Sequence, residues 1–336
     1  MLDLLKQLCL IDGISGDEGA VREFIINQIK DHCEYKVDNL GNIICFKKGK
    51  KSSAKKVMLD AHTDEVGLII SNITQDGYLK FCTVGGIDTT ALLSRRVVIN
   101  GKINGVIGCK PFHLLDADNR KKAPKCDSLY IDIGAKNRED AEKYVALGDS
   151  AVVQSDFEIL GECIKSKALD DRIGCLILIM LLKEYNEYDF YATFSTQEEV
   201  GLRGAKAAAF AVKPDFAIAI DSTTAADIAD VAKEKQVCFQ SKGAVVSFMD
   251  KATMYDKQMY TAAMQSGIPC QAKTFISGGN NAGSIHLSGE GVRTMAISAP
   301  CRYIHTADSI VNVKDIESML SLCKYMLNLL AGGNLT

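Results

Sequence analysis

The side chains best suited to chemistry in this 336-residue chain are histidines, aspartates and glutamates at five separate positions. They are His62 with Asp64 two residues later, Asp170, the pair Glu198-Glu199, Asp221 and His305. A hydrolytic two-metal centre requires imidazole nitrogens and carboxylate oxygens as ligands. No cysteine lies at ligand spacing in this chain. Imidazole and carboxylate ligands suit zinc, cobalt or manganese. The set therefore predicts a centre that holds two divalent metal ions as cofactors.

Four of the five positions end or closely follow an apolar run that predicts a buried strand. These runs are 56–61, 190–195, 216–220 and 294–304. In an open α/β sheet ligands bind at the carboxyl ends of the strands, so these strands would bring their polar residues to one edge. Each position alone has an ordinary explanation, because a histidine at a strand end is usually structural and an aspartate before a helix usually caps it. Their joint occurrence favours the metal centre.

Local spacing assigns roles to the first three of these residues. His62 and Asp64 are two apart in an extended segment, so their side chains point to the same side and Asp64 can hydrogen-bond His62. Asp170 and Asp171 precede a long apolar helix. Asp171 suits the N-cap of that helix, which leaves Asp170 to bridge two cations.

The number of candidate ligands fits two ions. Because neighbouring side chains diverge, one member of the Glu198-Glu199 pair can bind a metal while the other accepts a proton from the attacking water. Two metals that share one aspartate would each take one histidine and one further carboxylate. Sharing Asp170 assigns His62 and Asp221 to one metal, assigns Glu199 and His305 to the other, and leaves Glu198 as the general base.

The composition narrows the range of partners and compartments. The formal net charge of −3 gives no reason to expect nucleic acid or an anionic membrane as a partner. No apolar run approaches the roughly 18 residues of a membrane span, and the first residues lack the basic start and long apolar core of a signal peptide. The twelve cysteines are spread singly without a CxxC pair. We therefore expect free, buried thiols in a reducing cytoplasm.

Two different patterns divide the chain. From about 67 to 161, short strand-like runs recur between turn signals, and a helix is expected only at 138–146, which suggests a small β-barrel or sandwich. From 170 onward strands and helices alternate, as in an α/β layer architecture. The simplest organisation is an α/β catalytic domain of residues 1–66 and 162–336, interrupted by an inserted β-rich domain of residues 67–161. In the last part we expect helices at 172–185, 204–211, 254–266, 282–288 and 315–330, and strands at 190–195, 216–220, 236–239, 271–275 and 294–297.

Five motifs carry a family resemblance that runs over nearly the whole chain. They are AHTDEVG (61–67), KALDDRIG (167–174), FSTQEEVGLRGA (194–205), AIDST (219–223) and RYIHT (302–306). These motifs resemble the tetrahedral and glutamyl aminopeptidases, a family of dinuclear metallopeptidases in which some members were long labelled as cellulases. The resemblance implies an α/β fold with a phosphorylase/hydrolase-like three-layer catalytic domain and an inserted β-rich, PDZ-like or barrel domain used for dimerisation.

The same resemblance implies residue roles and partners. It implies metal ligation by His62, Asp170, Glu199, Asp221 and His305, with Glu198 as the general base and Asp64 as the partner of His62. Peptides would be the substrates, and the chain would form homo-oligomers, such as a dodecamer built from dimers. One departure stands out, because residues 278–282 read Gly-Gly-Asn-Asn-Ala where the family usually shows Gly-Gly-Thr-Asp-Ala. An amide at Asn281 thus replaces an acid expected near the substrate path, which would affect substrate preference rather than metal binding.

The leading hypothesis is a cytosolic metal-dependent aminopeptidase that removes N-terminal residues from peptides. A first alternative is a β-glucanase, because glycosidases need only two carboxyl groups that flank the bond and no metal. The two histidines and the number of ligands count against it. A second alternative is a non-catalytic oligomeric scaffold, in which an intact base and ligand set would have no use.

Overall fold

A single mixed sheet of eleven strands forms the larger part of the molecule in the computed structural model, which describes residues 1–116, 121–185 and 187–335. The strand order is β1-β2-β12-β3-β13-β16-β17-β11-β10, and β14 pairs with both β15 and β16. The bounds are β1 (Glu34–Val37), β2 (Ile43–Lys47), β3 (Val57–His62), β10 (Glu158–Leu160), β11 (Cys163–Ser166), β12 (Phe190–Ser195), β13 (Phe216–Thr224), β14 (Ala244–Val246), β15 (Cys270–Ala272), β16 (Arg293–Arg302) and β17 (Ser309–Asn312).

The four central strands of this sheet are adjacent and parallel. β12 pairs with β3, β3 with β13, and β13 with β16, all in parallel register. Their sequences are apolar on both faces, as is typical of strands covered by helices on both sides. All six residues of β3 are buried, for example. Because parallel strands end at the same edge, the segments after β3, β12 and β16 emerge side by side.

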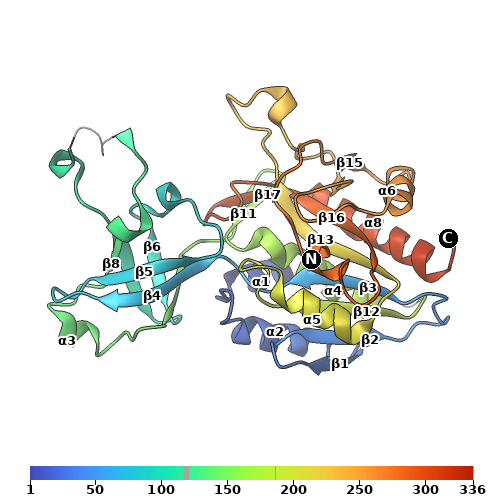
Figure 1. The fold of residues 1–336 in the computed structure, drawn as a ribbon, viewed down its shortest axis with the longest axis horizontal. Helices are drawn as coiled ribbons and strands as arrows, with labels where there is room; N and C mark the ends of the chain where they lie inside the picture. The colour runs from blue at the N-terminus through green and yellow to red at the C-terminus, as the bar shows by residue number, and fades with distance from the viewer. Residues whose placement is uncertain (117–120, 186, 336) are drawn as a thin grey trace.

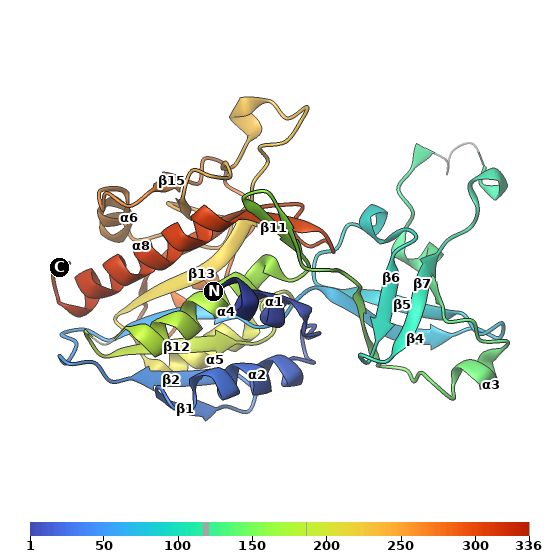
Figure 2. The same ribbon diagram turned by 180° about the vertical axis from the view of Figure 1, so that it is seen from behind.

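Helices cover both faces of the sheet, which gives the three layers (Figures 1 and 2). One face carries α1 (Leu2–Leu10), α2 (Gly19–Ile29), α4 (Leu169–Glu184), α6 (Lys257–Met264) and α8 (Val313–Ala331), which share the largest hydrophobic core. The other face carries α5 (Arg203–Val212) and α7 (Ala282–Ile285), packed on a smaller core. Within the described residues, no helix combines the length and apolar character needed to cross a membrane.

A closed antiparallel barrel forms the second lobe of the molecule, on the left in Figure 1. Its strands are β4 (Gly67–Ile73), β5 (Leu79–Val84), β6 (Arg96–Ile99), β7 (Ile103–Gly108), β8 (Tyr130–Asp132) and β9 (Ser150–Val153), in the order β4-β5-β8-β7-β6-β9. The barrel has its own hydrophobic core. An ion pair of 2.7 Å between Arg95 and Asp308 links it to the sheet lobe. The predicted fold class, α/β layers with a β-rich PDZ-like or barrel domain, is confirmed, and the β-rich part is a closed barrel.

Several predicted elements differ in extent from those in the structure. The helix expected at 138–146 is the shorter α3 (Arg138–Ala141), and the one at 282–288 ends at Ile285. The strand expected at 216–220 continues to Thr224, because β16 pairs with it as far as Cys301. Asp221 therefore lies inside β13 and not at its end.

The strand predicted at 236–239 is wrong. The segment follows the 3-10 turn Lys233–Lys235 and contains no strand. The side-chain amide of Gln271 accepts a hydrogen bond from the Phe239 N–H and donates one to the Phe239 carbonyl, at 2.9 and 2.7 Å. The Gln271 side chain therefore satisfies the backbone N–H and carbonyl of Phe239, which a neighbouring strand would otherwise satisfy. Residues 236–239 consequently form no strand.

Candidate metal centre

The structure brings the five predicted ligands together at the carboxyl edge of the parallel strands. His62 Nε2 lies 3.3 Å from Asp170 Oδ1 and 3.7 Å from Asp221 Oδ1. His305 Nε2 lies 3.3 Å from Asp170 Oδ2 and 3.2 Å from Glu199 Oε1. The two imidazoles thus face two overlapping sets of carboxylates, and both sets include Asp170. This is the grouping that the count of ligands predicted.

Asp170 occupies the middle of the cluster. Its two carboxylate oxygens face different imidazoles, one from β3 and one from the loop after β16. Asp170 Oδ1 is buried and has no hydrogen-bond donor among the described residues. An ionised oxygen without a donor is costly to bury, whereas a cation would satisfy it. The carboxylate therefore fits a position between two metal ions.

The orientation of the imidazole rings also fits metal ligation. His62 Nδ1 lies 3.0 Å from the Asp64 backbone carbonyl, and His305 Nδ1 lies 2.8 Å from the Gly86 carbonyl. A carbonyl oxygen only accepts hydrogen bonds, so each Nδ1 carries the proton. In a neutral ring the Nε2 lone pair then points at carboxylate oxygens, which is favourable only with a cation between them. Gly86 follows β5, so the barrel lobe helps to orient His305.

The electrostatics of the cluster indicate a shortage of positive charge. Burial raises the pKa of Glu198 well above its ordinary value, and Asp221 and Glu199 raise it further. Burial and Asp170 raise the pKa of Asp221 to about 7. Burial alone would lower the pKa of His305, but its contacts with Asp170 and Glu199 outweigh this and raise the pKa to about 11. The carboxylates therefore tend to keep their protons, and the imidazoles tend to gain one. Two divalent cations bound here would supply the missing positive charge in place of these protons.

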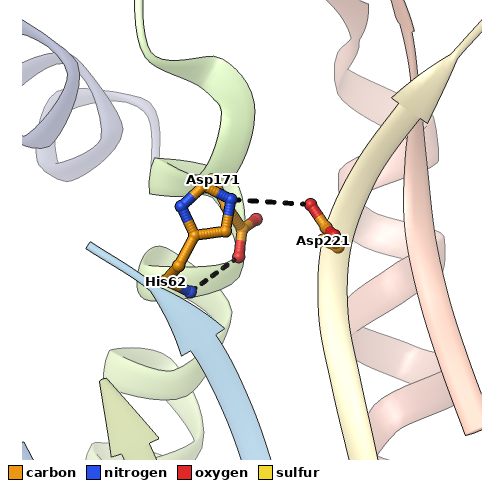
Figure 3. A group of neighbouring side chains, drawn as sticks. All are labelled: His62, Asp171 and Asp221. Carbon is orange, nitrogen blue, oxygen red and sulfur yellow. Dashed lines mark hydrogen bonds and ion pairs between the residues drawn. The ribbon is translucent and has the colours of Figure 1, made fainter. Parts of the chain in front are cut away.

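Asp171 lies beside the cluster but has a different task. Its Oδ1 accepts a hydrogen bond from the Gly174 N–H at 2.9 Å, which caps the helical part of α4 as predicted. Its Oδ2 accepts one from the His62 backbone N–H at 3.3 Å, and Figure 3 shows it with His62 and Asp221. The ligand atoms of these three residues lie within 4.8 Å of one another. Backbone N–H groups thus occupy both Asp171 oxygens, whereas Asp170 Oδ1 has no hydrogen-bond donor among the described residues. The cis peptide bond between Asp170 and Asp171 was not predicted.

Asp64 makes contacts that its spacing from His62 did not reveal. Its Oδ1 is 3.5 Å from His62 Nδ1, but the ring's hydrogen bond goes to the Asp64 carbonyl. The two carboxylate oxygens accept hydrogen bonds from the N–H groups of Glu198 and Glu199, at 3.0 and 3.1 Å, and from the Ser15 hydroxyl at 2.6 Å. Asp64 therefore fixes the loop that carries both glutamates.

Replacing Asp64 with Asn is expected to misplace this loop. An amide oxygen can accept one of the two backbone N–H groups, while its NH2 opposes the other. We expect kcat on a peptide substrate to fall by about 10–100-fold, with a smaller change in metal content by elemental analysis. Ser15→Ala is the matched control, because it removes one hydrogen bond to the same carboxylate and leaves the loop contacts intact. Wild-type kcat in Asp64→Asn would refute this role.

A buried ionic group behind the cluster was missed from the sequence. Arg172 is fully buried, and its Nε donates to the Thr63 carbonyl at 3.0 Å while its Nη1 donates to the Ile11 carbonyl at 3.0 Å. Lys167 Nζ and Glu65 Oε1 form an ion pair of 2.5 Å nearby. These contacts tie the loop after β3 to α1 and α4. An arginine directly after an aspartate pair was the available signal, since a buried guanidinium requires several acceptors.

The expectation for Asn281 is corrected by the structure. Its side-chain amide donates to Asp60 Oδ2 and to Ser195 Oγ, both at 2.8 Å, and the residue is buried. Asn281 does not line the cavity of about 370 Å³ that borders the candidate ligands, whereas Asn280 does. An acid at 281 would face the Asp60 carboxylate. The amide is therefore a packing partner of Asp60 and not a group on the substrate path.

Comparisons with known proteins agree with this geometry. The family described as M42 glutamyl aminopeptidase matches residues 41–322. A protein of Acetivibrio thermocellus named as an aminopeptidase is 39% identical over 96% of this chain and 97% of its own length. The lysyl aminopeptidase of Pyrococcus furiosus is 33% identical over 97% of this chain and 96% of its own length.

Two solved structures show the same fold. The aminopeptidase APDkam598 of Desulfurococcus kamchatkensis has a TM-score of 0.91 and 35% identity, over 96% of this chain and 93% of that one. The TET1 peptidase of Pyrococcus horikoshii, which can assemble into a tetrahedron or a large octahedral shell, has a TM-score of 0.84 and 34% identity, over 97% of this chain and 98% of that one. The chain belongs to the M42 glutamyl aminopeptidase family.

Proposed function

We propose that this M42 aminopeptidase works with two divalent metal ions, both of which Asp170 would help to hold. The observation that carries the proposal is the arrangement of Asp170, whose two oxygens face the Nε2 atoms of two histidines at 3.3 Å each. His62 and Asp221 would complete one metal site, and Glu199 and His305 the other. Zinc, cobalt or manganese fits this set of oxygen and imidazole ligands. When bound, such ions polarise the scissile carbonyl and lower the pKa of water.

Glu198 would move the proton in this reaction. Its side chain lines the cavity beside the cluster, and no hydrogen bond or ion pair to its carboxylate is found among the described residues. Its backbone N–H is held by Asp64 at 3.0 Å. Burial raises its pKa, which makes it a better proton acceptor than an exposed glutamate. It would accept a proton from the attacking water and return it to the leaving amine of the peptide.

The proposal also covers the division into domains, the assembly and the cellular compartment. We infer that residues 67–161 act as an inserted domain for subunit assembly and that residues 1–66 and 162–336 form the catalytic domain. The assembly of the TET1 peptidase supports a homo-oligomer, and a dodecamer built from dimers is the form we propose. All twelve cysteines are free, which supports a reducing cytoplasm as the compartment. The family match and the aminopeptidase relatives count against the β-glucanase alternative, and a full ligand set with a spare glutamate counts against the scaffold.

Removal of metal tests the proposal directly. Dialysis against EDTA should abolish release of nitroaniline from an aminoacyl-nitroanilide panel, because the carboxylates alone cannot polarise the scissile bond. It should also lower Tm by about 5–10 °C, since the buried carboxylates lose their counter-charge. Adding back zinc, cobalt or manganese should restore both. Full turnover by protein that elemental analysis shows to be metal-free would refute the proposal.

A further inference from the structure

The loop that carries Glu198 is held by side chains from distant parts of the chain. β12 ends at Ser195, so the next four backbone N–H groups lie beyond the ladder of the sheet, and each donates to a side-chain oxygen. The acceptors are Asn42 for residue 196, Glu18 for residue 197 and Asp64 for residues 198 and 199, at 2.9, 3.1, 3.0 and 3.1 Å. Because a backbone N–H group in a folded chain requires an acceptor, these three side chains set the path of the loop.

Glu18 is a buried acid that does not cap the helix it precedes. It stands at the N-cap of α2, where a carboxylate usually accepts a hydrogen bond from the first turn, but its side chain makes no such bond. Its Oε1 instead accepts the N–H of Gly16 at 2.9 Å and the N–H of Gln197 at 3.1 Å. The residue is 4% exposed. Its carboxylate therefore joins the start of α2 to a loop 179 positions further along the chain.

The backbone of Gln197 has a conformation that its contacts must impose. Its φ of +56° lies in the left-handed region, which residues other than glycine, asparagine and aspartate rarely adopt. Such a conformation persists only where the surrounding structure holds it. Glu18 holds the N–H of this residue, and the Arg203 N–H donates to its carbonyl at 3.2 Å. Without Glu18, rotation about φ at residue 197 would turn Glu198 away from its present direction.

The contact needs the oxygen atom of Glu18 and not its charge. Burial raises the pKa of Glu18 more than the N–H groups of Gly16 and Gln197 lower it, and the Asp64 carboxylate raises it further. The surroundings thus disfavour the ionised form. An amide oxygen at the same place can accept the same two N–H groups, whereas the shorter side chain of aspartate cannot reach them. Exchange for glutamine and for aspartate therefore separates the hydrogen bond from the charge.

We propose that Glu18 is a positioning residue for Glu198, because it fixes the N–H of the preceding residue and so directs the Glu198 carboxylate into the cavity beside the candidate metal centre. This role rests on the proposed function, in which Glu198 takes the proton of the attacking water. Proton transfer requires the base within hydrogen-bond reach of that water, so a small displacement lowers the rate steeply. The Glu199 N–H would stay bound to Asp64, which keeps this candidate ligand in place.

The test measures kcat, KM and metal content in metal-loaded variants, with the aminoacyl-nitroanilide that the wild type cleaves fastest. Glu18→Asp and Glu18→Ala should lower kcat by about 10–100-fold, with little change in KM or metal content. Glu18→Gln should restore kcat to within about threefold of wild type. Glu23→Ala, which removes an exposed glutamate from the same helix, is the matched control and should keep the wild-type values. The aspartate and glutamine variants decide the outcome if Glu18→Ala does not fold.

Several results would overturn the role of Glu18. Wild-type kcat in Glu18→Asp would show that its reach does not matter. A kcat as low in Glu18→Gln as in Glu18→Asp would show that the charge matters and not the hydrogen bond. A loss of metal in step with kcat would show that Glu18 acts through a metal ligand and not through the base.

A double-mutant cycle with Glu198→Gln tests the connection to the base. Once the base is absent, Glu18→Asp should lower the residual kcat by less than about twofold. Equal factors in both backgrounds would show that the two residues act independently, so that the positioning role is wrong and the aminopeptidase function stands. Wild-type kcat in Glu198→Gln, or no cleavage by the metal-loaded wild type, would instead refute the proposed function itself.

Discussion

The variant Glu198→Gln is expected to lower kcat on peptide substrates by about 10²–10⁴-fold while it keeps the wild-type metal content. The amide has nearly the same shape as the carboxylate but cannot accept a proton from water. Glu198 lines the cavity, and among the described residues its side chain forms no hydrogen bond or ion pair with either histidine, so its replacement should leave the ligands in place. Single-turnover kinetics and elemental analysis on the same preparation measure both quantities.

Glu199→Gln is the matched control, because it makes the same chemical change one residue further along the loop. Glu199 Oε1 lies 3.2 Å from His305 Nε2, at the position of a metal ligand. This variant should therefore lose metal as well as activity. If Glu198→Gln loses metal and Glu199→Gln keeps it, the two roles are exchanged. Wild-type turnover in Glu198→Gln would exclude Glu198 as the base.

The variant Asp170→Asn is expected to lose both metal and activity. One oxygen of Asp170 faces His62 and the other faces His305, so an amide NH2 would replace an oxygen ligand on one of the two sides. We expect the metal content to fall from two ions per chain to one or fewer. kcat should fall by about a thousandfold or more, because both ions act on the same bond. Elemental analysis and nitroanilide hydrolysis measure the two effects.

Asp171→Asn is the control for this variant, since Asp171 is adjacent and equally buried. Its oxygens accept the N–H groups of Gly174 and His62, and one amide oxygen can still accept the first of these. We expect this variant to bind metal but to lose about 0.5–2 kcal/mol of stability in chemical denaturation, as for a weakened helix cap. If Asp171→Asn loses metal while Asp170→Asn keeps it, the bridging carboxylate belongs to Asp171.

Much of the architecture follows from short-range patterns in the sequence. The apolar runs before His62 and before Glu198-Glu199 predict buried strands of an open α/β sheet, and the structure ends β3 at His62 and β12 at Ser195, in parallel register. The convergence of the predicted ligands follows from this, because parallel strands share one carboxyl edge. The change from closely spaced strands to alternating strands and helices likewise predicted a small β-barrel or sandwich beside an α/β sheet, and the structure has the barrel.

The residue roles that the sequence did not reveal depend on contacts between segments far apart in the chain. Asp64 holds the N–H groups of residues 198 and 199, more than 130 positions away, so its two-residue spacing from His62 showed only part of its task. Asn281 pairs with Asp60 across 221 positions, and a motif comparison alone placed it near the substrate. Arg172 reaches carbonyls of α1 and of the loop after it. Spacing along the chain cannot show such partners.

A crystal structure of zinc-loaded protein with anomalous diffraction at the zinc edge tests the central claim most directly. The account predicts two anomalous peaks about 3.5–4 Å apart, with one oxygen of Asp170 on each. His62 and Asp221 should bind one ion, Glu199 and His305 the other, and Glu198 should bind neither. A single peak, or two peaks that do not share Asp170, would contradict the two-metal account.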